Sequence, residues 1–498
     1  MAKALQDKKV VVVGSGFSGL SAACHLAKNG AKVIVLEKNE QAGGRARLFE
    51  EKGYRFDMGP SWYWMPDVFE RYFSSFGRKV TDYYTLKRLS PSYRIYWADD
   101  YMDVPADYQE LKKLFDQLEP GAGEKLDQFM AEAAYKYNVG VGKLVYKPSL
   151  SWTEFMDAEL IRGVFKLDVF NNIKSHIAKF FKHPKLRQLM EFPVLFLGAL
   201  PENTPALYSL MNYADIKLGT WFPDGGMYSV VAGMHRMATE LGVQFHFNKN
   251  VTRIHVQNNQ AKSVETEDGE ILEADAVVGA ADYHFIESSL LDQQYRSYSE
   301  KYWDKRLMAP GSLIYYLGVN KKVEGILHHT LFFDVPFDEH GKDIYTNPKW
   351  PETPLFYLSS TSITDPGHAP EGCDNLFFLI PIAAGLDGDD DAVREKYLHI
   401  ICERFKQKTG YDIKEHLVFK RTYCTKEFKE DYNAFKGNAY GLANTLLQTA
   451  ILRPSCKSKK VRNLYYTGQL TVPGPGVPPS LISGEVVAKL IDKEFNSA

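Results

Sequence analysis

A glycine-rich stretch near the start of the sequence has the residue types and spacing of a dinucleotide-binding turn. It follows a run of four valines and precedes a helical pattern, so the motif G-x-G-x-x-G falls where a strand should become a helix. The first glycine of such a turn permits a tight bend, the second lets backbone approach a pyrophosphate, and the third lets the helix pack closely. Because a helix N-terminus attracts phosphate oxygens, we expect the pyrophosphate to lie against Gly14, Ser15, Gly16, Phe17, Ser18 and Gly19. A chance glycine turn is the alternative.

An acidic residue, Glu37, follows the next predicted strand, Lys32 to Leu36. A carboxylate at this place, about 20 residues after the glycines, accepts hydrogen bonds from both hydroxyls of an adenosine ribose and repels a 2′-phosphate. We therefore expect Glu37, with Lys38 beside it, to bind the ribose of a cofactor that has no 2′-phosphate.

The elements that position these residues are two parallel strands joined through a helix. The valine run is apolar throughout, as a parallel strand covered on both faces requires. A second glycine pair, Gly43-Gly44, lies just beyond Glu37 and is followed by Arg45. This spacing suits a long cofactor that continues past its pyrophosphate. The sequence has no second G-x-G-x-x-G, which argues against a separate nicotinamide site.

The glycine pair and the block from Tyr54 to Ser61 resemble the superfamily of FAD-binding amine oxidases and phytoene desaturases. The resemblance implies FAD as the cofactor, and an acceptor other than bound NAD(P), either oxygen or a quinone, to reoxidise the flavin. It implies that Val251, at the start of a predicted antiparallel meander, contacts the adenine through its backbone. Further implied contacts are Gly44, Arg45, Gly59, Pro60, Ser61 and Trp62.

The end of the chain has a strand pattern that stops at Gly468-Gln469, a Pro-Gly-x-Gly segment and a helix predicted over Leu481 to Ile491. A helix N-terminus aimed at the flavin pyrimidine would stabilise the negative charge of the reduced ring. This ending, together with the block 186–226, resembles the bacterial CrtI-type carotenoid desaturases over nearly the whole chain. The contacts that it implies are Gly468, Gln469, Gly476, Val477 and Pro478.

That resemblance implies an FAD-dependent oxidoreductase that takes an apolar C40 carotenoid from a bilayer and removes a hydride and a proton. Phytoene desaturation is the expected reaction, and a later-acting desaturase of the 1,2- or 3,4-type is the alternative within the family. Outside it, the alternatives are a flavin amine oxidase and a binding protein of the prenyl-protein escort or GDP-dissociation inhibitor kind. Arg187 and His183 are the candidates for proton handling, the alternative being that both contact lipid headgroups. His183-Pro184-Lys185 stands where family members often carry an acid.

Residues 161–200 are where we expect the protein to meet a membrane. From Arg162 to Arg187, seven basic residues accompany a single acid, Asp168, and apolar residues recur near helical spacing. A basic amphipathic helix of this kind lies in the interface with its apolar side chains in lipid. The apolar run Phe192 to Leu200 would then be the mouth of a substrate tunnel, with Leu197 at that mouth. A domain-packing helix with a solvated basic face is the alternative.

Composition agrees with a large enzyme and argues against other classes. A net charge of −2 creates no field that favours nucleic acid, and the five cysteines are scattered without C-x-x-C spacing, so we expect free thiols and no metal site. The polar stretch Met1 to Lys9 has no apolar core of a secretory signal, and no apolar run reaches the roughly 18 residues of a membrane-spanning helix. We expect a peripheral protein on the cytoplasmic face of the cell membrane.

At 498 residues the chain is too long for one core, so we expect several domains. The expected fold is α/β, with a Rossmann-like FAD-binding domain of the amine-oxidase and glutathione-reductase type built from residues 1–80, 219–300 and 455–498. Residues 81–105 and 301–454 should form a mixed-sheet substrate domain, which a hairpin at 93–104 begins. Residues 106–218 should form a helical membrane-associating subdomain.

Overall fold

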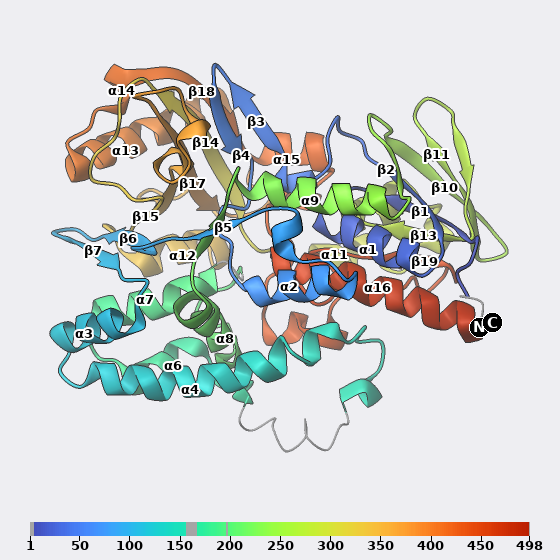
Figure 1. Ribbon diagram of the computed structural model, residues 1–498, viewed down its shortest axis with the longest axis horizontal. Helices are drawn as coiled ribbons and strands as arrows, with labels where there is room; N and C mark the ends of the chain where they lie inside the picture. The colour runs from blue at the N-terminus through green and yellow to red at the C-terminus, as the bar shows by residue number, and fades with distance from the viewer. Residues whose placement is uncertain (1–3, 156–166, 196–197, 498) are drawn as a thin grey trace.

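The structure, a computed structural model, describes residues 4–155, 167–195 and 198–497. Figure 1 shows a parallel sheet with its helices at one side of the molecule, a larger sheet at the other side, and a layer of helices beneath the larger sheet. The architecture is α/β, as the sequence predicted.

The parallel sheet has five strands in the order β19-β13-β1-β2-β9. They are β1 (Lys9–Val13), β2 (Lys32–Leu36), β9 (Gln244–His246), β13 (Ala276–Gly279) and β19 (Leu464–Tyr466). The valine run lies in the centre with β2 and β13 on either side, which explains why it is apolar throughout. Helix α1 (Phe17–Lys28) packs against both α9 (Met227–Glu240) and α16 (Val477–Ser497). Segments from the two ends of the chain therefore complete one layer.

Smaller β elements surround this sheet. An antiparallel meander consists of β10 (Val251–Gln257), β11 (Gln260–Thr266) and β12 (Ile271–Glu273). Two further pairs are β3 (Leu48–Glu51) with β4 (Tyr54–Asp57), and β5 (Leu86–Arg88) with β8 (Trp221–Pro223).

The larger sheet has seven strands in the order β18-β14-β17-β16-β15-β6-β7, of which only the pair β15–β6 is parallel. They are β6 (Tyr93–Tyr96), β7 (Tyr101–Val104), β14 (Gly311–Val319), β15 (His329–Phe332), β16 (Phe356–Ser359), β17 (Asp374–Ile382) and β18 (Leu417–Tyr423). The predicted hairpin at 93–104 is confirmed as β6 and β7.

The two faces of the seven-stranded sheet have different environments, because successive side chains of a strand point to opposite faces. Phe332, Leu358 and Ile380 belong to an apolar cluster that includes residues of α13 (Asp391–Thr409). Their neighbours Leu331, Tyr357 and Leu379 line a cavity instead.

The helical layer contains α3 (Tyr108–Leu118), α4 (Ala122–Gly140), α6 (Ile173–Phe180), α7 (Pro184–Leu195) and α8 (Leu210–Tyr213). Two of these, α6 and α7, correct the expectation of one continuous basic helix. The break falls just before Pro184, whose ring disfavours helical backbone at the residue before it. The remaining α-helices among the described residues are α2 (Pro66–Ser75), α10 (Tyr283–Ser289), α11 (Glu300–Asp304), α12 (Phe337–Tyr345), α14 (Ile413–His416) and α15 (Thr425–Tyr432).

The apolar face of α6 lies inside the protein. Ile173, Ile177 and Phe181 are fully buried, and α6 packs against α4. The expectation that the apolar side chains of this helix enter lipid is therefore wrong for Ile173 and Ile177, while Phe180 is only partly buried. Residues 156–166, with Arg162 and Lys166 among them, and Leu197 lie outside the described residues. Within the part of the chain that the structure describes, no helix is both long and apolar enough to cross a bilayer.

Candidate active site

The glycine turn between β1 and α1 forms one wall of a cavity of about 430 Å³. Gly14 has a φ of +106°, which residues with a Cβ rarely adopt. A Cβ on Gly16, which lines the cavity, would meet only the carbonyl oxygen of Gly43 at 4.0 Å. A Cβ on Gly19 would lie 2.1 Å from the carbonyl oxygen of Gly14. Gly16 thus leaves room at the cavity wall, whereas Gly19 lets the helix pack on the turn.

The N-terminus of α1 borders the same wall and suits an anion. No side chain caps this end, and the first turn contains no acidic residue. The first N–H groups of a helix have no partner within it and carry a partial positive charge. Phe17 and Ser18 line the cavity, so these donors are available to a pyrophosphate there.

Glu37 lies just beyond β2, and its carboxylate is held in place by four donors. One oxygen accepts hydrogen bonds from the backbone N–H of Ser15 at 2.8 Å and from its hydroxyl at 2.7 Å. The other accepts from the backbone N–H and the side-chain amide of Asn39 at 2.9 and 3.0 Å. The two backbone donors fix the carboxylate, while the two side-chain donors are rotatable. A pair of ribose hydroxyls can therefore take the positions of the rotatable donors.

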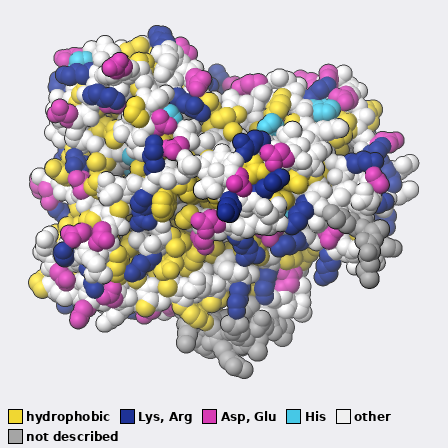
Figure 2. Space-filling model, in the orientation of Figure 1, with side chains coloured by type: hydrophobic (Ala, Val, Ile, Leu, Met, Phe, Trp, Pro, Cys, Tyr) yellow, Lys and Arg dark blue, Asp and Glu magenta, His cyan; other side chains and the backbone are white. Residues whose placement is uncertain are grey.

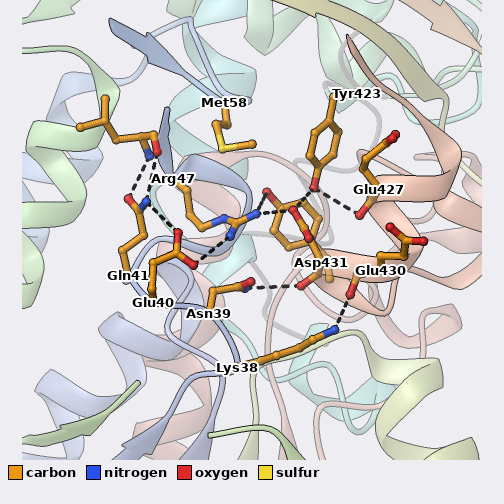
Figure 3. Close-up of polar contacts among 12 residues, drawn as sticks. Lys38, Asn39, Glu40, Gln41, Arg47, Met58, Tyr423, Glu427, Glu430 and Asp431 are labelled. Carbon is orange, nitrogen blue, oxygen red and sulfur yellow. Dashed lines mark hydrogen bonds and ion pairs between the residues drawn. The ribbon is translucent and has the colours of Figure 1, made fainter. Parts of the chain in front are cut away.

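A group of contacts that we call the α15 clasp ties this ribose end to helix α15 (Figure 3). Arg47 is buried, and its guanidinium donates to a carboxylate oxygen of Asp431 at 2.5 Å. The hydroxyl of Tyr423 donates to the same oxygen at 2.7 Å. Lys38 donates to the carbonyl oxygen of Glu430 in this close-up. The clasp joins residues nearly four hundred positions apart in sequence, and Asp431 also lines the cavity.

Arg45 places a half-buried positive charge at the cavity. Burial lowers the pKa of its guanidinium, and the carboxylate of Asp282, which also lines the cavity, acts in the opposite direction. Gly59 lies so close that a Cβ there would be 2.5 Å from the carbonyl oxygen of Arg45. A glycine at position 59 is therefore required for the close packing of the segments that contain Gly59 and Arg45, both of which line the cavity.

The end of the chain completes the wall. Gly468 has a φ of +110°, and its N–H donates to the hydroxyl of Ser483 at 3.0 Å. Helix α16 begins at Val477, four residues earlier than the sequence predicted, and Gly476, Val477 and Pro478 line the cavity. The N-terminus of α16 therefore lies at the cavity, as that of α1 does.

The other part of the cavity is apolar and aromatic. Trp62 stacks on His329 with ring centroids 3.9 Å apart and planes inclined by 10°, and its ring centroid lies 5.7 Å from that of Phe192. The apolar lining residues of this part include Trp62, Trp64, Met65, Phe192, Leu200, Met211, Leu331, Phe333, Phe337, Leu355 and Leu379. Phe192 and Leu200, both buried, thus line the cavity from within.

The structure gathers the predicted cofactor residues around this one cavity. All of them except Gly19 line it, from Gly14 through Val251 to Pro478. The two predicted proton-handling residues, Arg187 and His183, do not line it. The Nε of Arg187 donates to the carbonyl oxygen of Phe181 at 2.8 Å, and the backbone N–H of His183 donates to Glu119 at 2.9 Å.

Several residues that line the cavity were not predicted from the sequence to belong to the site. Asp431, Tyr432 and Tyr357 come from the seven-stranded sheet or the helix after it, and no local motif marks them. Alternation along β16 was the one available signal for Tyr357. It shows which side chains share a face, but it does not show what that face covers.

The donors at one end of the cavity and the apolar walls at the other fit an extended cofactor with a ring system beside an apolar ligand. A model of the family described as flavin containing amine oxidoreductase matches residues 17–492. The chain belongs to this family. FAD is accordingly the cofactor of this flavin oxidoreductase.

Curated relatives match the oxidoreductase over almost its full length. It is 43% identical to a carotenoid 3,4-desaturase of Haloarcula japonica over 493 residues, which cover 99% of each chain. It is 31% identical to a zeta-carotene-forming phytoene desaturase of Myxococcus xanthus, with 98% of this chain and 95% of the relative covered. A lycopene-forming phytoene desaturase of Pseudescherichia vulneris is 29% identical, with 98% and 100% covered.

Solved structures share the fold at low sequence identity. An oxidoreductase from Methanosarcina mazei superposes with a TM-score of 0.64 at 14% identity and covers 97% of this chain and 100% of its own. Putrescine oxidase bound to putrescine superposes with a TM-score of 0.62 at 15% identity and 97% and 99% coverage. A Rab GDI from Plasmodium falciparum has a TM-score of 0.52 at 14% identity, covering 84% and 89%. These likenesses concern the fold alone.

Proposed function

We propose that this flavin oxidoreductase is a late-acting carotenoid desaturase that forms a 3,4-double bond in a carotenoid that is already conjugated. The observation that carries the proposal is the 43% identity over 99% of both chains with the carotenoid 3,4-desaturase. Phytoene desaturation was the first expectation from the sequence. The relatives named for it are 31% and 29% identical, so the comparisons favour the later-acting alternative.

The lining of the cavity supports an apolar substrate. Its charged residues are Glu37, Lys38, Arg45, Lys249, Asp282 and Asp431. All of them lie on the segments of the cofactor end or in the α15 clasp, while the aromatic part has none among the described lining residues. A polyene needs no charged partner, whereas the ammonium group of an amine does when it is desolvated. This distribution favours a carotenoid over an amine.

In the proposed reaction the protein mainly binds and orients. When bound, FAD supplies a two-electron acceptor that takes a hydride from a substrate carbon. The N-terminus of α1 and Gly16 hold the pyrophosphate, and Glu37 holds the ribose. The N-terminus of α16 places a partial positive charge at the cavity. Trp62 and Phe192 fix the polyene against the cofactor and exclude water, so that the reacting carbons stay in one position.

The same proposal includes peripheral attachment to the cytoplasmic face of a membrane. Each buried CH₂ of a carotenoid favours lipid by about 0.8 kcal/mol, so the substrate resides in the bilayer and the protein must meet it there. Four leucines, which we call the leucine surface, are exposed: Leu307, Leu446, Leu447 and Leu452. Leu447 is 75% exposed, and Gln448 beside it hydrogen-bonds both backbone groups of Leu307. Exposed apolar groups of this kind mark membrane or protein contacts.

Other surface features agree with this attachment. Lys305 and Arg306 directly precede the leucine surface and suit anionic headgroups. Tyr440, six residues before Leu446, lines the cavity, so one chain segment runs from the cavity wall to this surface. On the face in Figure 2, further hydrophobic side chains gather over the helical layer, while charges of both signs are interspersed.

The test of the activity is incubation of the purified, FAD-loaded protein in liposomes that contain phytoene, neurosporene or lycopene. Each added double bond lengthens the conjugated chain, so products are read from their absorption and identified by chromatography. We expect turnover of a conjugated carotenoid and none of phytoene. Turnover of phytoene alone would restore the first expectation, and turnover of none of the three would overturn the desaturase assignment. Runs with and without oxygen, and with an added quinone, identify the electron acceptor.

A further inference from the structure

A line of polar groups crosses the aromatic wall of the cavity. The hydroxyl of Ser61 lies 2.9 Å from that of Tyr357, and the hydroxyl of Tyr357 lies 2.6 Å from Nδ1 of His329. Ser61 and Tyr357 line the cavity, while His329 is fully buried behind the wall, stacked on Trp62. A neutral imidazole in this position can accept a proton from the phenol.

His329 is the first of three neighbouring histidines. Its ring centroid lies 4.5 Å from that of His328, and both His328 and His368 pack on Phe222. Each of the three has Nδ1 at a hydroxyl: that of Tyr357 at 2.6 Å, of Thr364 at 2.7 Å and of Thr361 at 2.8 Å.

The Nε2 atoms of these histidines are buried and have no hydrogen-bond partner among the described residues. Nε2 of His368 lies 3.5 Å from a carboxylate oxygen of Asp365, whose side chain is 24% exposed. Buried polar atoms without partners are rare in proteins and require an explanation. Three such atoms lie in the histidine cluster that has Tyr357 at one end and Asp365 at the other.

The imidazole of His340, which also lines this part of the cavity, has hydrogen bonds at both ring nitrogens. Nε2 of His340 donates to the carbonyl oxygen of Pro381 at 2.8 Å, and Nδ1 accepts from the backbone N–H of Leu355 at 2.9 Å. Among the described lining residues of the aromatic part, Tyr357 is the one whose hydroxyl is bonded to an imidazole.

We propose that Tyr357 is the catalytic base of the desaturation, and that His329 and the histidines behind it carry the proton away; this inference rests on the proposed function. One substrate C–H bond breaks with its electron pair, which leaves as hydride to the flavin. The neighbouring C–H bond then breaks, its electron pair becomes the new π bond, and its proton binds the hydroxyl oxygen of Tyr357. The original hydroxyl proton of Tyr357 moves to Nδ1 of His329. His329 releases a proton from Nε2 towards His328, His368 and Asp365.

The charges in this scheme suit a buried site. Burial and the neighbouring His328 lower the pKa of His329 well below its ordinary value, so the ring is neutral at rest and Nδ1 is free to accept. The polyenyl cation that forms when the substrate loses a hydride is a strong acid, so a weak base is enough to remove its proton. The step moves a positive charge from carbon to imidazole and creates no new buried charge, which keeps the desolvation cost low.

The test compares Tyr357→Phe with the wild type, both FAD-loaded, in liposomes with the carotenoid that the wild type desaturates. General base catalysis contributes about 10²- to 10⁴-fold, so we expect kcat to fall at least about 100-fold with an unchanged KM. A solvent isotope effect on the wild-type rate in D₂O should disappear in the variant. His329→Gln keeps a hydrogen-bond acceptor for the phenol but removes the base that takes its proton, so kcat should also fall at least about 100-fold.

Tyr315→Phe is the matched control. Tyr315 lies in β14 of the same sheet but on the opposite face, where its hydroxyl donates to the carbonyl oxygen of Arg394 at 2.6 Å. This control loses a buried tyrosine hydroxyl without touching the cavity, so its kcat should equal that of the wild type. A Tyr357→Phe protein with wild-type FAD content and wild-type kcat would overturn the assignment of the base. A wild type that desaturates no carotenoid would overturn the proposed function itself.

Discussion

Substitution of Gly16 separates binding of the cofactor from folding of the protein. Gly16 has φ −69° and ψ 178°, an extended conformation open to any residue, and a Cβ there meets only the oxygen of Gly43 at 4.0 Å. In Gly16→Val the Cβ therefore meets no close contact with the protein, and the backbone already has a conformation that valine adopts. The side chain projects instead where the pyrophosphate must approach the turn. We expect the apoprotein of Gly16→Val to unfold at the wild-type temperature and to have lost most of its affinity for FAD.

The expected loss of affinity follows from the hydrogen bonds that the valine displaces. A hydrogen bond to a charged group contributes about 1.5–3 kcal/mol, and two backbone donors of the turn and of α1 would lose their contact with the pyrophosphate. A loss of about 3–6 kcal/mol raises Kd roughly 10²- to 10⁴-fold. Titration of the apoprotein with FAD, followed by flavin fluorescence, measures Kd, and calorimetry of the apoprotein measures its unfolding.

A paired substitution gives the opposite result. In Gly19→Ala the new Cβ would lie 2.1 Å from the carbonyl oxygen of Gly14, so the helix must move away from the turn. We expect this apoprotein to unfold at a lower temperature than the wild type. Wild-type affinity for FAD in Gly16→Val would refute the placement of the pyrophosphate at this turn.

The remaining predictions concern other parts of the molecule. Burial raises the pKa of Glu191 from 4.5 to about 7, so its ionisation destabilises the fold as pH rises from 4.5 through 7. Glu191→Gln should therefore have the wild-type stability to thermal unfolding at pH 4 and be more stable than the wild type at pH 8, by up to about 3 kcal/mol. Equal stability of the two proteins at pH 8 would contradict this. Asp431→Asn removes the charged partner of buried Arg47, so the free energy of unfolding, measured in urea, should fall by on the order of 2 kcal/mol, and an unchanged value would show that the α15 clasp contributes nothing. Leu447→Glu should reduce flotation with anionic liposomes, whereas Ile271→Glu, at a residue 60% exposed on β12, should float as the wild type does; equal flotation of both would exclude the leucine surface.

Local sequence predicted the parts of the site that a short segment determines. The glycines of the turn must bend the backbone and make room, and each requirement acts within a few residues, so the motif was sufficient to place Gly14 and Gly16. Glu37 follows from the length of the strand before it. The partners of this segment in the α15 clasp could not be found in the same way. The pairing of Arg47 with Asp431 depends on how two distant parts of the chain meet.

The helical layer shows that an amphipathic pattern predicts an apolar face but does not tell whether lipid or protein covers it. The spacing of Ile173 and Ile177 predicted a helix with one apolar face, and α6 has that face. The same spacing serves a face covered by lipid and a face covered by protein, and here α4 covers it. Exposed leucines lie elsewhere, in short segments around Leu447, where no periodicity marks them.

The position of β19 and α16 has a consequence for how the protein is made. β19 forms one edge of the five-stranded sheet by pairing with β13, and α16 packs along α1 while its first residues line the cavity. A ribosome translates these two elements after everything else that the structure describes. Until they emerge, β13 has an unpaired edge, α1 has an uncovered face and the cavity has an incomplete wall. FAD therefore enters a site that is completed only after residues 464–497 have been synthesised, and chains that stop before this point cannot enclose it.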